Sequence, residues 1–420
     1  MESLRALVKS TLLNAVPIPI VLKSMRLILA LPPSVAQRLV ADYTTPTQQE
    51  ENWICRIKQD TWTGAWIAPG LGECNQQEVL ERVKAADLII YEVHGGGFRI
   101  GHCLMYMKHF TTWLTLLKKK HGINAVIVSI EYGLAPLHKY PTQIHECMDA
   151  YRYLLEELNV PASKIVLAGD SAGGALCMET LMRFYAPNVI NDINSPREYM
   201  KATLPAGMAL FSPLVSGDKD NWLWEANKHD IVSPQLAELV FKEYLDFPNK
   251  TKEEIPSFRL YGITSGFDRF FPKNVSVYVG EQEVMRDDIL GTASRIMEDS
   301  KFNVDIHRED LVHDWYFVQE IVPQEDRHLF EKYDHTFVDF MAKSIKEARE
   351  TIEVTSQNAD CLVSQAEIAQ ITSKLLFESS VLDPNIGLVE EDEKIAMIQN
   401  DTQLDAVQAA LYATPQPVAA

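Results

Sequence analysis

The chain has 420 residues, a formal net charge of −19 at pH 7, and a hydrophobic share of 46%. That apolar share is ordinary for a globular protein and can fill a sizeable core. The acidic balance argues against a nucleic-acid partner, because phosphate binding needs a basic surface. The length allows one large domain with extensions, and we predict an N-terminal helical or cap segment over 1–50, a main domain over 51–350 and an acidic C-terminal extension over 351–420.

The first 41 residues are basic within an acidic chain, since they hold five basic side chains and one acid. Their apolar runs, over 10–22 and 27–35, are both shorter than the roughly 20 residues that span a bilayer. Basic residues interleaved with apolar ones suit a membrane surface. Short helices that cover the mouth of a site are the other interpretation, and both stay open. We expect a cytoplasmic protein, with peripheral contact to an intracellular membrane through residues 1–41 as the alternative.

Strands and helices alternate through the middle of the chain. Short apolar runs predict strands over 53–57, 65–68, 87–93, 125–130, 164–168, 204–211, 275–279 and 302–306. Helical spacing of apolar residues predicts helices over 140–158, 172–185 and 287–300. This alternation indicates a mostly parallel sheet with helices on both faces and two antiparallel strands at one edge. The long stretch over 216–263, between two core strands, predicts a cap insertion.

A nucleophile motif, Gly-Asp-Ser-Ala-Gly-Gly over 169–174, lies between a predicted strand and a predicted helix. A serine on a tight strand-to-helix turn projects its oxygen outward, free of the backbone. Neighbouring side chains crowd such a turn, so glycine is needed two residues to either side, here Gly169 and Gly173. We therefore predict that Ser171 is a nucleophile and that Asp170 supports the motif.

Three consecutive glycines end an earlier predicted strand, where Gly95, Gly96 and Gly97 follow His94. Consecutive glycines allow backbone N–H groups to point into a site with no Cβ in the way, which an oxyanion hole requires. We predict that the amides of Gly95 and Gly96, together with that of Ala172, donate to a tetrahedral oxyanion. His94 and Gly97 are predicted to support this loop.

These two motifs together resemble those of the hormone-sensitive-lipase-like esterases, a lipolytic group with a Gly-Asp-x-Gly motif. The segment Glu-Tyr-Gly-Leu-Ala-Pro over 131–136 is similar to the group's Tyr-Arg-Leu-Ala-Pro-Glu, with Gly133 in place of arginine and Leu137 in place of glutamate. The resemblance covers residues 50–345 and implies an α/β-hydrolase fold with an N-terminal cap. The chain as a whole is similar to fungal sterol-deacetylase-like members.

The catalytic base follows the acid in the chain order of this fold, which directs attention to the late histidines. His313 lies on the loop beyond the last predicted strand, from which a base can reach Ser171. It resembles the group's His-Gly-Phe, with Asp314 and Trp315 as the following pair. We assign the other late histidines to regular structure: His307 to the end of the last predicted strand, and His328 and His335 to a predicted closing helix. We therefore predict His313 as the base.

The acid is expected just after the predicted strand over 275–279. Related enzymes have Gly-x-x-Asp-x-Leu-x-Asp there, so Glu283 takes the place of the usual aspartate. Its extra methylene still allows a carboxylate to reach Nδ1–H of His313. Asp287 is the rival, with a shorter side chain one helical turn further along. A surface charge that caps the following helix is the alternative for Glu283.

A serine, an acid and a histidine in this chain order imply hydrolysis of a carboxylic ester. The resemblance implies a short- or medium-chain acyl ester of an apolar alcohol as the small-molecule substrate. No cofactor and no metal is implied, and none of the six cysteines has the paired spacing of a zinc or redox site. Two alternatives stay open: amide hydrolysis, which shares the machinery, and a non-catalytic small-ligand receptor on the same fold, which would be expected to lack the base.

Overall fold

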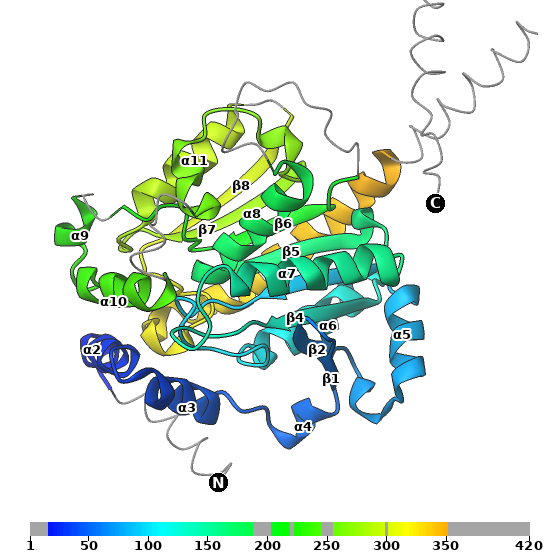
Figure 1. Ribbon diagram of the computed structural model, residues 1–420, viewed down its shortest axis with the longest axis horizontal. Helices are drawn as coiled ribbons and strands as arrows, with labels where there is room; N and C mark the ends of the chain where they lie inside the picture. The colour runs from blue at the N-terminus through cyan, green and yellow to red at the C-terminus, as the bar shows by residue number, and fades with distance from the viewer. Residues whose placement is uncertain (1–15, 188–202, 219–221, 246–254, 299–300, 352–420) are drawn as a thin grey trace, which may run out of the picture. The chain divides into compact units, whose positions relative to one another are not determined.

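The computed structural model describes residues 16–187, 203–218, 222–245, 255–298 and 301–351 (Figure 1). The chain divides into two compact units, Met1–Ala348 and Arg349–Ala420. Nearly all described residues belong to the first unit. The predicted extension over 351–420 lies outside the described residues apart from its first residue, and so do the first 15 residues of the predicted N-terminal segment. The division into three parts therefore stays a prediction.

In the described residues, eight strands form one sheet in the order β1-β2-β4-β3-β5-β6-β7-β8. The strands are β1 Ile54–Lys58, β2 Thr63–Ile67, β3 Leu88–Val93, β4 Ala125–Glu131, β5 Ile165–Asp170, β6 Gly207–Phe211, β7 Asn274–Gly280 and β8 Asn303–Glu309. β2 is antiparallel to both of its neighbours, and all pairs from β4 to β8 are parallel. The predicted sheet, with its antiparallel edge, is confirmed.

Each parallel strand is apolar along its length because both faces of the sheet are covered. In β3, Ile89, Tyr91 and Val93 join one buried cluster, and Leu88 and Ile90 join the other. The first cluster is closed by α5 Gln76–Ala85, α7 Thr142–Arg152, α8 Ser171–Tyr185 and α11 Arg286–Met297. The second is closed by α6 Met107–His121 and the helix over 328–351. A layer of helices therefore lies on each face of the sheet.

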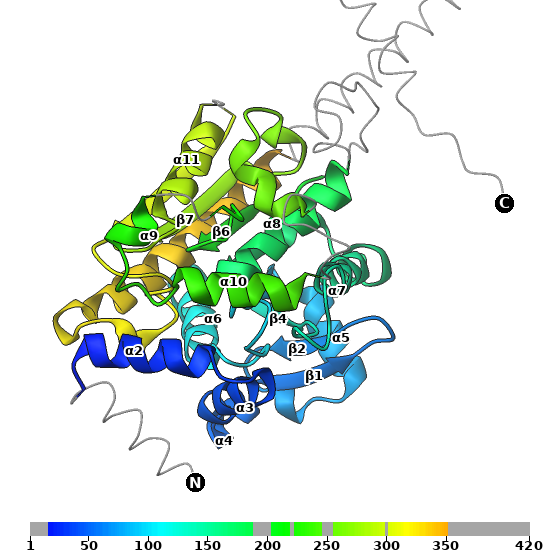
Figure 2. The same cartoon turned by 60° about the vertical axis from the view of Figure 1, so that its left-hand side comes forward.

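Two further groups of helices border the carboxyl edge of the sheet. The N-terminal group is α2 Ile18–Leu29, α3 Pro33–Tyr43 and α4 Gln48–Glu51, and the group between β6 and β7 is α9 Leu223–Ala226, α10 Pro234–Tyr244 and the 3-10 helix η5 Pro256–Gly262. α2 and α10 are neighbours in both views (Figures 1 and 2). In the part of the chain that the structure describes, no helix is both long enough and apolar enough to cross a membrane.

One buried side chain joins these two groups to the core. Arg99 follows the three-glycine loop and is 2% exposed. Its guanidinium donates to the carbonyls of Leu29 and Leu31 at 2.7 and 2.6 Å and to the carboxylate of Glu243, on α10, at 2.5 Å. A charged group at this depth requires such partners. The N-terminal helices and α10 are therefore held by the loop that carries the glycines.

The close approach of α8 to the end of β3 depends on Gly173. A Cβ at this position would lie within 2.6 Å of the carbonyl oxygen of His94 and would overlap that of Val93. Both neighbours are backbone atoms, so no side-chain rotation can relieve the overlap. Glycine is therefore required where α8 crosses the end of β3.

We expect Gly173→Ala to lower the free energy of unfolding by about 3 kcal/mol or more, the upper end for overpacking, because backbone must move to admit the methyl group. Urea titration followed by circular dichroism measures this change. Gly262→Ala is the matched control, since a Cβ at Gly262 meets nothing within 4 Å. Equal stability of the two variants would contradict the steric argument.

Candidate active site

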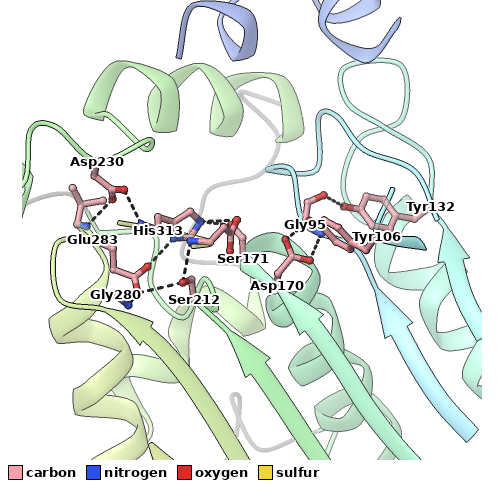
Figure 3. Close-up of polar contacts among 12 residues, drawn as sticks. Gly95, Tyr106, Tyr132, Asp170, Ser171, Ser212, Asp230, Gly280, Glu283 and His313 are labelled. Atoms are coloured by element: carbon pink, nitrogen blue, oxygen red, sulfur yellow. Dashed lines mark hydrogen bonds and ion pairs between the residues drawn. The ribbon is translucent and has the colours of Figure 1, made fainter. Parts of the chain in front are cut away.

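Ser171 lies at the turn between β5 and α8, as the motif predicts. Its φ of 44° is in the left-handed region, which costs a non-glycine residue roughly 1–2 kcal/mol. The backbone packs tightly around this turn. A Cβ at Gly169 would lie 2.7 Å from the carbonyl carbon of Gly173, so there is no room for a side chain. This strained conformation directs the Ser171 hydroxyl away from the sheet edge, toward the loops that follow β7 and β8 (Figure 3).

The structure brings Ser171, His313 and Glu283 into one hydrogen-bonded chain (Figure 3). Nε2 of His313 lies 2.9 Å from Oγ of Ser171, and Nδ1 lies 2.8 Å from Oε2 of Glu283. A carboxylate can only accept, so Nδ1 carries a proton, and in the neutral form of the ring Nε2 then accepts from the serine hydroxyl. The rival acid Asp287 instead accepts from the guanidinium of Arg286 at 2.9 Å. Of these two candidates, Glu283 is thus the carboxylate in contact with Nδ1 of His313.

Glu283 is fully buried, and its second oxygen is also hydrogen-bonded. Oε1 accepts from the amide of Gly280 at 2.7 Å and from the hydroxyl of Ser212 at 3.3 Å. The Ser212 hydroxyl in turn accepts from the amide of Asp314 at 3.2 Å. The longer side chain of glutamate is accommodated because one oxygen turns back onto its own loop while the other reaches the imidazole.

A second buried carboxylate, Asp230, joins the loops of the base and the acid. One oxygen accepts from the amide of His313 and the other from the amide of Val284, both at 2.9 Å. Burial raises the pKa of Asp230 to about 6. The carbonyl groups of Lys228 and Asp230 accept from the guanidinium of Arg26, on α2. Sequence reasoning missed both Ser212 and Asp230.

The predicted oxyanion donors need one correction. The amide of Gly95 donates to the buried carboxylate of Asp170 at 2.7 Å and is therefore not free to bind an oxyanion. Gly96 and Gly97, with φ of 96° and 61°, lie outside the helices and strands, and within the described chain their amides donate to no protein oxygen. Ala172 lies in the first turn of α8, where amides lack an intrahelical acceptor. The free amides are thus those of Gly96 and Gly97, with Ala172 beside Ser171.

The buried side chain of His94 stabilises the loop that carries the three glycines. Its ring stacks on that of Tyr132 at 4.2 Å between centroids, and the Tyr132 hydroxyl donates to the carbonyls of His94 and Gly95 at 2.8 and 3.0 Å. Burial lowers the pKa of His94 to about 3, so the ring is neutral at physiological pH. His94 therefore acts as packing for the glycine loop and takes no part in the hydrogen bond between His313 and Ser171.

A family profile described as the α/β hydrolase fold matches residues 90–317, more than half of the chain. The chain belongs to the α/β-hydrolase-fold family. Among curated relatives, arylacetamide deacetylase of Mus musculus is 35% identical over 92 residues, which cover 21% of this chain and 22% of that protein. Human hormone-sensitive lipase is 35% identical over 104 residues, which cover 24% of this chain and 9% of that protein. The predicted resemblance to hormone-sensitive-lipase-like proteins is confirmed.

The matched segments span less than a quarter of either curated relative. Solved structures extend the comparison over most of the α/β-hydrolase domain. An esterase from the bacterial hormone-sensitive lipase family superposes with a TM-score of 0.57 at 21% sequence identity, covering 78% of this chain and 98% of that chain. At 21% identity, the structural similarity shows that the two chains share a fold and carries no further conclusion. The similarity to fungal sterol-deacetylase-like proteins stays a prediction.

This α/β hydrolase carries an additional carboxylate next to His313. Oδ2 of Asp314 lies 3.1 Å from Nε2 of His313, the same nitrogen that faces Ser171. Asp314 has a φ of 56°, in the left-handed region that favours glycine. Burial alone would lower the pKa of His313, but the carboxylates of Asp314 and Glu283 stabilise the imidazolium and raise the pKa well above its ordinary range.

Asp314→Asn removes a negative charge beside the imidazolium, so we expect the pKa of His313 to fall. The neutral ring, which is the form that can accept a proton, then persists to lower pH. A nuclear magnetic resonance titration of labelled histidine side chains measures the pKa directly. Asp310→Asn is the control, because Asp310 accepts from the side chain of Gln282 at 2.8 Å in a solvent-exposed hydrogen bond. An unchanged His313 titration in Asp314→Asn would show that Asp314 does not stabilise the imidazolium.

Proposed function

We propose that the chain is a serine-dependent carboxylic-ester hydrolase with Ser171 as nucleophile, His313 as base and Glu283 as acid. The observation that carries this proposal is the hydrogen-bonded chain from Glu283 through His313 to Ser171, with links of 2.8 and 2.9 Å. Unbroken contact from acid to base to hydroxyl is what activates a serine that is otherwise a weak nucleophile.

In the first half-reaction, His313 takes the hydroxyl proton as Ser171 attacks the ester carbonyl carbon. Negative charge develops on the carbonyl oxygen, and the amides of Gly96, Gly97 and Ala172 are the proposed donors to it. Glu283 holds the imidazole in its tautomer and stabilises the imidazolium. The alcohol leaves with the proton from Nε2, and water activated by the same base then hydrolyses the acyl-enzyme. Asp230 and Ser212 keep the base and acid loops in register during both steps.

A short- or medium-chain acyl ester of an apolar alcohol is the proposed substrate class. Support comes from the names of the relatives, a deacetylase and a lipase, which share the matched segments. The alternative of a non-catalytic receptor predicts a missing base, whereas His313 is present and in contact with Ser171. Hydrolysis is therefore the better proposal.

Amide hydrolysis is the second candidate, and Asp314 favours it. The leaving nitrogen of an amide carries a hydrogen that needs an acceptor as the C–N bond breaks. The Asp314 carboxylate lies 3.1 Å from Nε2 of His313, the atom that delivers the proton to the leaving group, and its Oδ1 is buried without a hydrogen-bond partner. An acceptor is thus available on the leaving-group side.

Ser171→Ala should lower turnover of nitrophenyl esters by about four to six orders of magnitude, because the nucleophile is removed. A fluorophosphonate probe should label the wild type and leave the variant unlabelled, and equal labelling would refute the assignment. Esters of graded acyl length define the acyl preference. Matched anilides test the second candidate, which is rejected if the wild type cleaves esters only.

Glu283→Gln should lower kcat on the order of a thousandfold, since an amide no longer holds the imidazole in the required tautomer. Asp287→Asn is the matched control, because Asp287 pairs with Arg286 and should affect local stability more than turnover. Steady-state kinetics on one ester, with melting temperatures for both variants, separate the two effects. Near-normal turnover in Glu283→Gln with collapse in Asp287→Asn would transfer the role to Asp287.

A further inference from the structure

The outward faces of α2 and α3 expose large apolar side chains. On α2, Ile20 and Leu27 are 55% and 63% exposed, and their spacing of two helical turns places them on one face. On α3, Val35 and Leu39 are each 44% exposed and lie one turn apart. These four side chains, which we call the outer face, are half of the exposed large hydrophobic side chains in the described residues. Such a concentration on two short neighbouring helices marks an interaction surface.

The charges around the outer face are basic. Lys23 is exposed on α2, between Ile20 and Leu27, and α2 contains no acidic residue. On α3, Arg38 is exposed beside Leu39, with Asp42 as the one acid of that helix, 3.9 Å away. The whole chain carries a net charge of −19, so a basic and apolar surface of this kind differs from the average of the protein. Its charge is complementary to an anionic partner.

The opposite side of α2 is fixed to the core. Val21 and Leu22 are buried there. Arg26 donates to the carbonyls of Lys228, at 2.6 Å, and Asp230, and Asp230 carries the amides of the base and acid loops. Figure 3 shows helices of the N-terminal segment above the Ser171–His313 pair. The outer face is therefore a rigid part of the unit that holds the site.

We propose that the outer face rests on an anionic lipid surface. Its four apolar side chains would enter the boundary between headgroups and acyl chains, and Lys23 and Arg38 would lie among the headgroup phosphates. α2 has 12 residues, about 18 Å of helix, which is too short to span the roughly 30 Å of hydrocarbon and suits a helix lying in the interface. Docking through this face places the site next to the membrane, where apolar esters dissolve. That last point alone rests on the proposed function.

Flotation of the full-length chain with vesicles tests the proposal. The wild type should float with vesicles that contain phosphatidylserine, less with pure phosphatidylcholine, and less at high salt, because salt screens the basic side chains. The double variant Ile20→Asp, Leu27→Asp should lower the partition coefficient about tenfold or more, since it places two charges in the apolar boundary. Both positions are exposed, so the melting temperature should stay close to that of the wild type.

Met297→Asp is the matched control, because Met297 is 51% exposed on α11, away from the outer face, and this variant should float like the wild type. Ser171→Ala should also float, which separates failure of lipid binding from failure of the proposed hydrolysis. Equal flotation of the double variant and the wild type, or no flotation of the wild type, would overturn the proposal. Light scattering that shows a wild-type dimer, lost in the double variant, with no lipid binding by either, would assign the outer face to a second copy of the chain.

Discussion

The arrangement of the site depends on the buried carboxylate of Asp170, which links the loop after β3 to the turn after β5. Its oxygens accept from the amide of Gly95 and the hydroxyl of Tyr106, both at 2.7 Å, and it immediately precedes Ser171. The turn that carries Ser171 and the loop that carries the free amides are therefore hydrogen-bonded to each other. Because Asp170 takes up the first glycine amide of the loop, the next two are oriented elsewhere. The relative position of hydroxyl and amides thus follows from one carboxylate.

Much of the fold could be predicted because its signals are local. The eight strands are short apolar runs, and each was expected within three residues of its observed bounds. The elbow at Ser171 could be recognised because the glycines that relieve its crowding have a fixed spacing. His313 and Glu283 could be placed because the carboxyl ends of parallel strands meet at one edge, so the residues after β7 and β8 must face the residue after β5. Among the helices that cover the sheet, α5 and α6 were not predicted, although a capping box at Asn75 and the left-handed Gly122 were readable end signals.

The rest depends on contacts that no local pattern encodes. Gly95 and Gly96 are adjacent glycines, and the sequence does not indicate which of the two amides donates to a protein group. The position of the Asp170 carboxylate oxygen decides this. Ser212 directly follows β6, at the same edge of the sheet as the site, so its position in the sequence could have indicated a role there. Asp230 lies inside the insertion between β6 and β7, where no strand register indicates which residue turns inward. Asp314 was noticed as a departure from the usual glycine, but its distance to Nε2 of His313 needed coordinates.

Asp230 has a consequence for how relatives of this chain can diverge. Insertions above a conserved sheet are commonly regarded as modules that evolution or protein engineering can exchange to change specificity, while the chemistry below stays intact. Here the insertion also supplies the acceptor for the backbone of the base and of the residue after the acid. The insertion and the loops that carry Glu283 and His313 thus depend on each other, and a transplanted insertion has to bring a carboxylate of its own to the place of Asp230.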